Sequence, residues 1–261
     1  MSNSDQGDPL PVLSFYQTDL ALLHGQLQRH PVAQAYLSGQ NIRFDGAALT
    51  QTDRIELPAP TGSVSTLGLA HLFSVFNGSR VHQQCKIRTG LTTRRQGCTL
   101  RVINRRILQY KNRTGIFKEH THPELFIQGL HIDHFFLRKE RSRARLATIA
   151  IALCAITAHL TKFGTISLVA AGGRAYNKRH VGYKVWPKLG FDANLLPGET
   201  SSDPRLQQCQ TVQDILAIDA EWWRVNGSQR LMTFDLSPNS ASWRKLLLYV
   251  HEKLLSDGEP T

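Results

Sequence analysis

The residue types best suited to chemistry lie in one short segment, His-Ile-Asp-His at residues 131–134. Carboxylate and imidazole groups can take up a proton from a substrate, so Asp133 and His134 are candidate general bases. Together with His120 and His122, the segment also raises the alternative of a metal site. The spacing of these histidines is not the spacing typical of zinc sites, so we expect no metal. Proton transfer is the chemistry that this segment could perform, and a structural role on its strand is the alternative for each residue.

A second set of functional candidates is positively charged. The chain carries a formal net charge of +11, and no acidic residue lies between Glu56 and Glu119. Lys and Arg crowd residues 80–118 and again residues 138–145. Basic side chains without carboxylates to pair them attract polyanions such as nucleic acid or a phosphorylated cofactor. The alternative is a solvated basic face that aids solubility.

The pattern that follows residue 124 indicates which elements position the candidate bases. Residues 125–138 alternate apolar and polar side chains and predict the strand that carries them. Residues 146–162 predict a helix that is apolar nearly all round and therefore buried, and residues 165–171 predict a short buried strand. A strand, a helix and a strand in this order form a right-handed crossover, which makes the two strands parallel. A further helix ends at Gly190.

The regions on either side predict more helix than strand. The first 80 residues contain helical patterns that are broken at Pro31 and stopped at an Asn-Gly pair. Residues 99–112 are rich in branched side chains and predict a strand or a bent pair of strands. Near the C-terminus we expect a helix with two tryptophans, a strand at residues 230–236 and a final amphipathic helix.

Composition limits the class of protein. The chain has 261 residues, of which 41% are hydrophobic, enough for one large domain or for a core domain with additions. Its first residues lack the features of a secretory signal, and the longest apolar run, residues 146–161, is shorter than the roughly 20 residues that a membrane-spanning helix needs. The cysteines show no Cys-x-x-Cys spacing, and Cys154 is expected to be a buried thiol. We expect a cytoplasmic protein without membrane contact.

The order of these elements, with the sequence Trp-Pro-Lys-Leu-Gly-Phe at residues 186–191, resembles the GCN5-related N-acetyltransferase (GNAT) superfamily, as a divergent member. The resemblance covers residues 99–193. It implies an α/β (α+β) fold in which helices flank a central mixed sheet, with helical N-terminal and C-terminal extensions. The implied domains are the first extension at 1–85, an acyltransferase core at 86–195 and a second extension at 196–261 that packs on the core.

The resemblance also implies acetyl-CoA as the acyl donor and gives particular residues a role. In this superfamily the cofactor is bound by the end of the fourth strand, by the loop before the next helix and by an Asn after the fifth strand. The cofactor-binding residues that the resemblance implies here are Phe136, Leu137, Arg141, Ser142, Arg143, Ala144, Arg145, Ala147 and Asn177. The loop of the superfamily contains glycines, whereas the loop here contains none, and arginine side chains could replace the lost amide contacts. The acid is often a tyrosine where this chain has Trp186. The candidate acid here is Tyr183, one helical turn earlier on nearly the same face.

These observations leave alternative functions open. The first is an N-acetyltransferase that moves the acetyl group of acetyl-CoA to an amine on an anionic substrate or macromolecule, either nucleic-acid-linked or protein. The second is a protein that keeps the fold without the catalysis and binds RNA or DNA through its arginine-rich face. A structural assembly component with an acyltransferase-like domain is the third. The fold supports all of them, so the site must decide.

Overall fold

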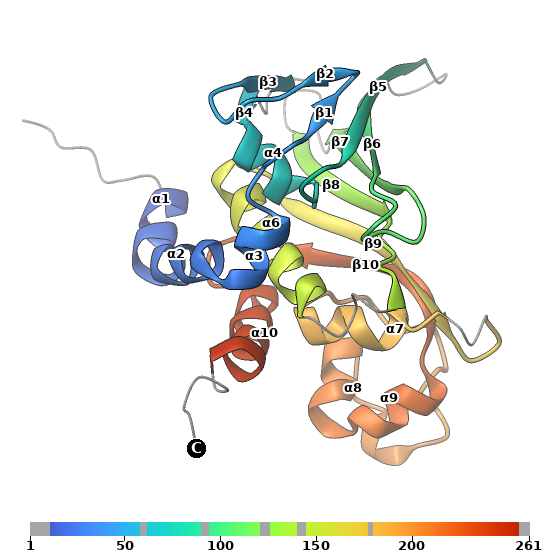
Figure 1. Ribbon diagram of the computed structural model, residues 1–261. Helices are drawn as coiled ribbons and strands as arrows, with labels where there is room; N and C mark the ends of the chain where they lie inside the picture. Colours follow the sequence, from blue (N-terminus) through green and yellow to red (C-terminus); the bar gives the residue numbers. More distant parts are fainter. Residues whose placement is uncertain are drawn as a thin grey trace, which may run out of the picture.

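The computed structural model describes residues 11–57, 62–89, 94–120, 126–139, 145–176 and 180–255. A mixed sheet of eight strands runs through the molecule in the order β10-β9-β8-β7-β6-β5-β1-β2, and β3 and β4 form a separate hairpin (Figure 1). The strands are β1 (Arg43–Phe44), β2 (Ala47–Ala48), β3 (Arg54–Leu57), β4 (Gly62–Ser65), β5 (Arg80–Thr89), β6 (Arg94–Ile103), β7 (Asn112–His120), β8 (Phe126–His134), β9 (Thr165–Gly173) and β10 (Ser228–Asp235). The predicted fold class, a central mixed sheet flanked by helices, is confirmed.

The helices are distributed along the whole chain, and in the view of Figure 1 they lie beside and below the sheet. The α-helices are α1 (Pro11–Phe15), α2 (Ala21–Arg29), α3 (Pro31–Tyr36), α4 (Thr66–Leu72), α6 (Leu146–Leu160), α7 (Gly182–Val185), α8 (Val212–Ile218), α9 (Ala220–Asn226) and α10 (Ala241–Val250). Shorter helical turns are η1 (Tyr16–Leu20), η2 (Trp186–Leu189), η3 (Pro204–Leu206) and η4 (His251–Leu255).

The predicted crossover lies near the β10 end of the sheet, between β8 and β9. Strands β5 to β8 pair antiparallel in sequence order, and α6 then leads to β9, which pairs parallel with β8. β10 returns antiparallel to β9 and lies at one end of the sheet. The strand, helix and parallel strand expected between residues 125 and 171 are therefore confirmed.

Helix α6 forms the middle of the hydrophobic core. Its side chains are apolar nearly all round, and α1, α2, α3, α4 and α10 pack against it. Burial raises the pKa of the Cys154 thiol to about 12, and its Sγ donates to the Leu72 carbonyl at 3.1 Å. This thiol is buried and inert, as expected. In the part of the chain that the structure describes, no helix combines the length and the apolar character needed to cross a membrane.

The segment at residues 99–112 is only partly a strand. β6 ends at Ile103, and β7 begins at Asn112. Asn104 is buried between them and donates from Nδ2 to the Asn77 carbonyl at 3.0 Å. The branched side chain of Ile107, which contributed to the strand pattern, is buried in the turn instead. A buried turn and a buried strand therefore have the same apolar signature here.

The first 80 residues contain the predicted helices and also four short strands that were not predicted. β1 extends the large sheet because Arg43 pairs with Arg80 and Phe44 with Val81, in parallel with β5. β1 and β2 have two residues each, too short a pattern to be recognised, and the pairing of β1 with β5 joins segments that lie far apart in the chain. The sheet thus continues into the segment expected to be a helical extension.

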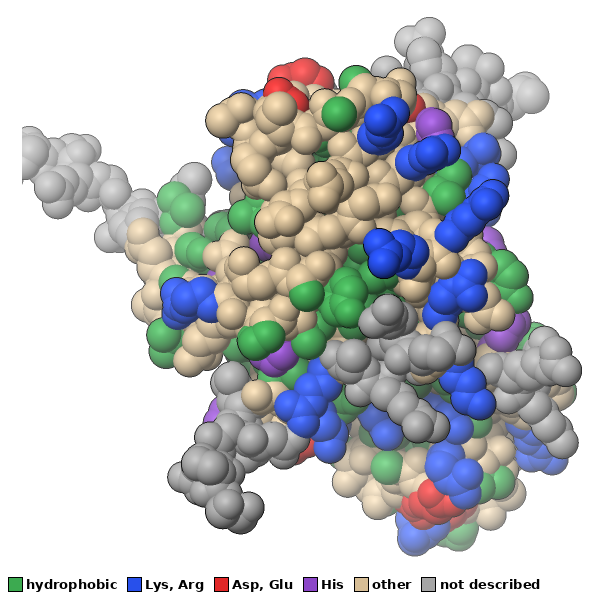
Figure 2. All heavy atoms as spheres, viewed as in Figure 1, with side chains coloured by type: hydrophobic (Ala, Val, Ile, Leu, Met, Phe, Trp, Pro, Cys, Tyr) green, Lys and Arg blue, Asp and Glu red, His purple; other side chains and the backbone are tan. Residues whose placement is uncertain are grey.

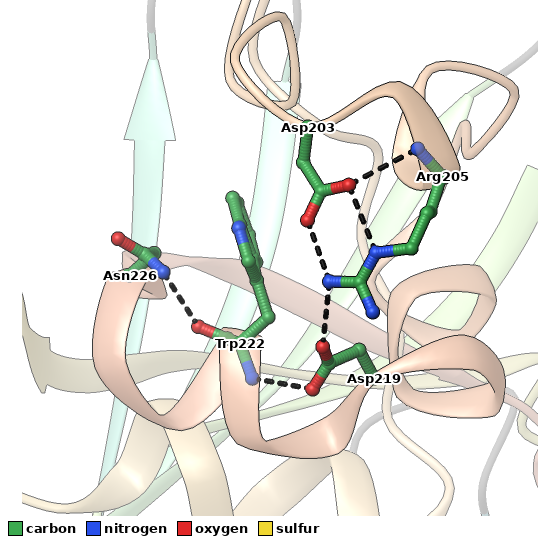
Figure 3. Close-up of polar contacts among 5 residues, drawn as sticks. All are labelled: Asp203, Arg205, Asp219, Trp222 and Asn226. Atoms are coloured by element: carbon green, nitrogen blue, oxygen red, sulfur yellow. Dashed lines mark hydrogen bonds and ion pairs between the residues drawn. The ribbon is translucent and has the colours of Figure 1, made fainter.

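The segment around α8 and α9 is held together by a polar network (Figure 3). The Arg205 guanidinium donates to Asp203 in a bidentate pair, at 3.1 and 2.7 Å, and also to Asp219 Oδ2 at 3.0 Å. Asp219 caps helix α9, because its Oδ1 accepts from the Trp222 amide at 2.8 Å. Through Arg205, the cap of α9 is tied to the loop that precedes α8.

Candidate functional site: a cleft between diverging strands

Strands β8 and β9, which are neighbours near the β10 end of the sheet, diverge from each other. Their parallel pairing ends at Ile132 opposite Leu168, although β8 continues to His134 and β9 to Gly173. The chain after β8 pairs instead with the turn between β6 and β7. Ligands of open α/β sheets bind at the carboxyl ends of neighbouring strands that separate in this way. The divergence is therefore the first place to look for a site.

A cavity of about 550 Å³ occupies this divergence, and we call it the cleft. Most of its walls are apolar and come from β8, α6, β9 and the segment around α7, and they include Ile132, Leu137, Ile151, Leu168, Val185 and Trp186. Predicted site residues Asp133, His134, Phe136 and Ala147 also line it. A mostly apolar cavity with a few polar groups is the usual form of a small-molecule site.

Glycines let α7 approach β9 and close one wall of the cleft. Gly172 has a φ of 105°, and a Cβ there would overlap the carbonyl oxygen of His180. At Gly182 a Cβ would lie 2.9 Å from the Ala171 amide nitrogen, closer than side chains tolerate. The backbone of the segment after β9 can therefore lie directly on the strand.

Trp186 joins this wall to the core. Its ring contacts Phe135 on the β8 side at a centroid distance of 6.2 Å and Phe191 at 5.3 Å, both edge to face. Gly190 ends η2 with a φ of 91°, as the sequence predicted, and lets the buried Phe191 turn back into the core. The run at 186–191 is thus both a wall of the cleft and an anchor of the fold.

The candidate bases belong to a small charged cluster at the end of β8. The Asp133 carboxylate forms an ion pair with Arg113 of β7, and its Oδ1 lies 3.4 Å from His134 Nδ1. Nearby, His131 Nδ1 shares a hydrogen bond of 2.9 Å with Ser167 Oγ. Burial and, second, the positive charge of Arg113 lower the pKa of His131. At neutral pH His131 is a neutral imidazole.

A second cavity, of about 990 Å³, adjoins the cleft, and we call it the basic groove. The two cavities share His134, Phe136 and His180 as lining residues. The cationic side chains that line the basic groove are Arg101, Arg105, Lys111, Arg113 and Arg138. No acidic residue is among the described residues that line it. An apolar cleft therefore meets a cationic groove at a pair of histidines.

The start of α6 lies at the cleft as well. Ala147, in its first turn, lines the cavity, and Arg145 precedes the helix with a φ of 57°. The first backbone N–H groups of a helix have no intrahelical partners and carry the positive end of its dipole. No acidic side chain lies in this first turn. The predicted cofactor residues Arg141, Ser142, Arg143, Ala144 and Asn177 lie outside the described residues.

Tyr183, the candidate acid, is not a lining residue of the cleft. Its hydroxyl donates to the Arg224 carbonyl at 2.8 Å, and its own carbonyl accepts from Trp223 Nε1 at 2.9 Å. These bonds attach α9 to α7. Proton donation by Tyr183 stays a prediction, and its observed contacts are structural.

Two residues of the site were not predicted as members of it. Arg113 was recognised only as one of many cations, and its ion pair with Asp133 depends on the register of β7 against β8. His180 reaches the site because the chain after β9 folds back, with Val181 bridging to Gly172. The paired glycines at 172 and 173 were the available signal for such a turn.

Comparison of the chain with models of protein families, with curated proteins and with solved structures found no match.

Proposed function

We propose that the protein is an N-acetyltransferase of the GNAT type, which uses acetyl-CoA and acts on an amine of an anionic substrate. The observation that carries the proposal is the divergence of β8 and β9 around an apolar cleft, between α6 and α7. The order β5 to β8, α6, β9, α7, β10 agrees with the order that the sequence resemblance implies.

The residues of the cleft fit an acyl-CoA. Its apolar walls suit an extended pantetheine chain, and beyond Ile132 the edge of β8 is free of pairing with β9, so its backbone can bond to amide groups. The start of α6, with Arg145, suits a phosphate group. Acetyl-CoA would supply the activated thioester. The use of acetyl-CoA and the free cysteines Cys98, Cys154 and Cys209 agree with a location in the cytoplasm, where thiols stay reduced.

The charged cluster on β8 suggests how the chain would handle the proton of an amine. His134 lies at the junction of the cleft and the basic groove, where an amine from the groove would meet an acyl group in the cleft. Asp133 would orient the His134 ring through the contact at 3.4 Å while Arg113 holds Asp133 in place. In this proposal His134 is the general base, and Asp133 and Arg113 are positioning residues.

A second function is favoured by a different observation, the basic groove. Its cations would serve a nucleic-acid-binding protein even if no acetyl group were transferred. The two functions differ in their use of the cleft, because only the acetyltransferase requires it to be open.

Filling the cleft tests the proposed function. Val185 lines it and is 38% exposed, whereas Val225, on α9, is 58% exposed and does not line it. Val185→Trp should therefore weaken the binding of acetyl-CoA by about tenfold or more, measured by isothermal titration, and Val225→Trp should leave the binding unchanged. The proposal fails if the wild-type chain shows no saturable binding of acetyl-CoA, or if the two variants bind it equally.

A further inference from the structure

The basic groove is the middle part of a longer series of cavities. A cavity of about 370 Å³ shares Ile103, Asn104 and Arg105 with the groove and also contains Arg80. A further cavity, of about 360 Å³, adjoins the cavity of about 370 Å³, and Gly78 lines both. The series, which we call the track, leads from the cleft across the ends of β8, β7, β6 and β5. Its length suits a chain-like ligand better than a compact one.

Unpaired positive charge follows the track. Arg80, Arg101, Arg105, Lys111 and Arg138 are all exposed. Among the described residues, no carboxylate lies within ion-pair distance of these five side chains, and Asp133 already pairs with Arg113. In Figure 2, Lys and Arg side chains follow the side of the molecule where β5 to β7 lie, whereas Asp and Glu gather mainly at its top and bottom. The track thus offers repeated positive charge to a ligand with repeated negative charge.

The backbone under the groove is fixed in position. The Gln109 amide donates to the Phe136 carbonyl at 2.9 Å, and the Arg138 amide donates to the Ile107 carbonyl at 2.8 Å. Arg138 Nε also donates to the Arg105 carbonyl at 2.7 Å. The turn between β6 and β7 is therefore bonded to the chain after β8. Cations on a fixed backbone lose less freedom when they bind a ligand.

Aromatic rings lie among these cations. Tyr110 is 60% exposed, and its ring contacts that of Phe136 edge to face at 5.7 Å. Phe136 in turn contacts the ring of His180 at 5.6 Å. Exposed rings beside a line of cations are what single-stranded nucleic acid requires, because its bases stack and its phosphates pair.

We propose that the track binds a single strand of nucleic acid, with phosphates on Arg80, Arg101, Arg105 and Lys111 and a base on Tyr110 beside the cleft. An acidic peptide would use the charges but not the exposed ring. Duplex DNA or RNA would hide its bases from that ring. The proposal deepens the polyanion binding proposed above and does not depend on acetyl transfer. Delivery of an amine by the strand, in contrast, rests on the proposed function.

Charge reversal tests the location of the site. The test variant combines Arg101→Glu with Lys111→Glu. The control variant combines Arg244→Glu on α10 with Lys253→Glu on η4, away from the track. Both variants change the net charge equally, and all four side chains are exposed. A fluorescent oligoadenylate of about 12 nucleotides is the probe, and anisotropy gives its Kd. We expect the first pair to weaken binding at least about tenfold and to reduce the salt slope by about 1.4, the loss of two phosphate contacts. Equal effects of the two pairs would show diffuse attraction and overturn the proposal.

The aromatic contact tests the class of ligand. Tyr110→Ala should weaken binding about tenfold without changing the salt slope, because a stacked base contributes no counterion release. Tyr176→Ala, which removes another exposed ring at 49% exposure, should have no effect. The proposal is wrong if Tyr110→Ala binds normally, if duplex RNA or polyglutamate binds as tightly as the single strand, or if acetyl-CoA displaces the probe completely. Val185→Trp should still bind the probe, which separates this proposal from the failure of the enzyme.

Discussion

The carboxylate of Asp133 faces two partners, Arg113 on β7 and His134 beside it in sequence. A carboxylate that accepts from a guanidinium is held in one orientation. It is therefore better suited to orient a neighbouring imidazole than to exchange protons itself. His134, in contrast, lines both the cleft and the basic groove and lies where the two substrates of a transferase would meet.

Replacing His134 tests this division of roles. His134→Gln keeps a polar side chain beside Asp133 but cannot accept a proton, so acetyl transfer should fall by about 100-fold or more. The assay is release of thiol from acetyl-CoA, with a 3′-amino-modified oligoadenylate as the acceptor. His251→Gln, an exposed histidine of η4, is the control and should keep the wild-type rate. A His134→Gln variant with unchanged rate and normal acetyl-CoA binding would refute the role of His134 as the base.

At this scale the sequence predicted residue types better than their partners. Asp133 and His134 were recognised because both are polar and lie on the most regular strand pattern of the chain. The partner of Asp133 could not be recognised, because Arg113 reaches it through a register that shifts at a bulge between β7 and β8. The role of Tyr183 was expected from its place on α7, but its hydroxyl bonds to a carbonyl of α9, a contact set by the tertiary fold.

At the scale of elements, the end of η2 connects the cleft to the core. An unbroken series of edge-to-face ring contacts runs from Trp186 through Phe191 and Phe234 to Trp243 on α10. Gly190 makes this series possible, because its positive φ turns the chain between the first two rings. The short helix α7 has little stability of its own and depends on these contacts for its position.

Substitution of Gly190 should therefore loosen the cleft wall. A Cβ at Gly190 would overlap the Ser242 carbonyl oxygen and lie 2.9 Å from Phe234 Cε2. Gly46 provides a matched control, since its φ of 93° is nearly the same and nothing lies within 4 Å of its Cβ position. Gly46→Ala should cost about 1 kcal/mol from the left-handed backbone alone, and Gly190→Ala about 2 kcal/mol more, measured by urea unfolding. Equal losses in the two variants would contradict a tight packing of Gly190.

The elements that the sequence predicted are those with long and regular patterns. The strand at β8, the apolar helix α6 and the strand β9 each show their period over many residues, and their order fixed the parallel pairing. The turn at 104–111 was not recognised, because the buried side chains of Ile107 and Leu108 have the apolar signature of a strand. The strands β1 and β2 were missed because each has only two residues.

At the scale of the whole molecule, the N-terminal helices and α4 bury histidines that the site does not use. His24 and His71 lie in contact, with ring centroids 6.1 Å apart, and both are buried. Tyr16 hydroxyl lies 2.9 Å from His24 Nδ1. Burial lowers the pKa of His24. The pKa of His71 is lowered from 6.5 to about 4, mainly because the ring is buried and, second, because positive charge on the two neighbouring rings would repel. The folded molecule therefore keeps both rings neutral when the unfolded chain would protonate them.

The stability of the protein should consequently decrease in mild acid. Between pH 6.5 and pH 4 the unfolded chain binds a proton at His71 and the folded chain does not, so the free energy of unfolding falls as the pH falls through this window. The lowered pKa of His71 corresponds to about 3 kcal/mol lost by pH 4, which urea unfolding at a series of pH values will measure. His71→Phe removes the titrating group, so its stability should depend on pH much less, and the remaining dependence comes from other groups whose pKa is lowered, among them His24, His30 and His131. His251→Gln, whose histidine is exposed, should keep the wild-type dependence. A wild-type stability that stays constant from pH 6.5 to pH 4 would mean that the folded protein takes up protons at these rings over the same pH range as the unfolded chain, which would contradict the lowered pKa.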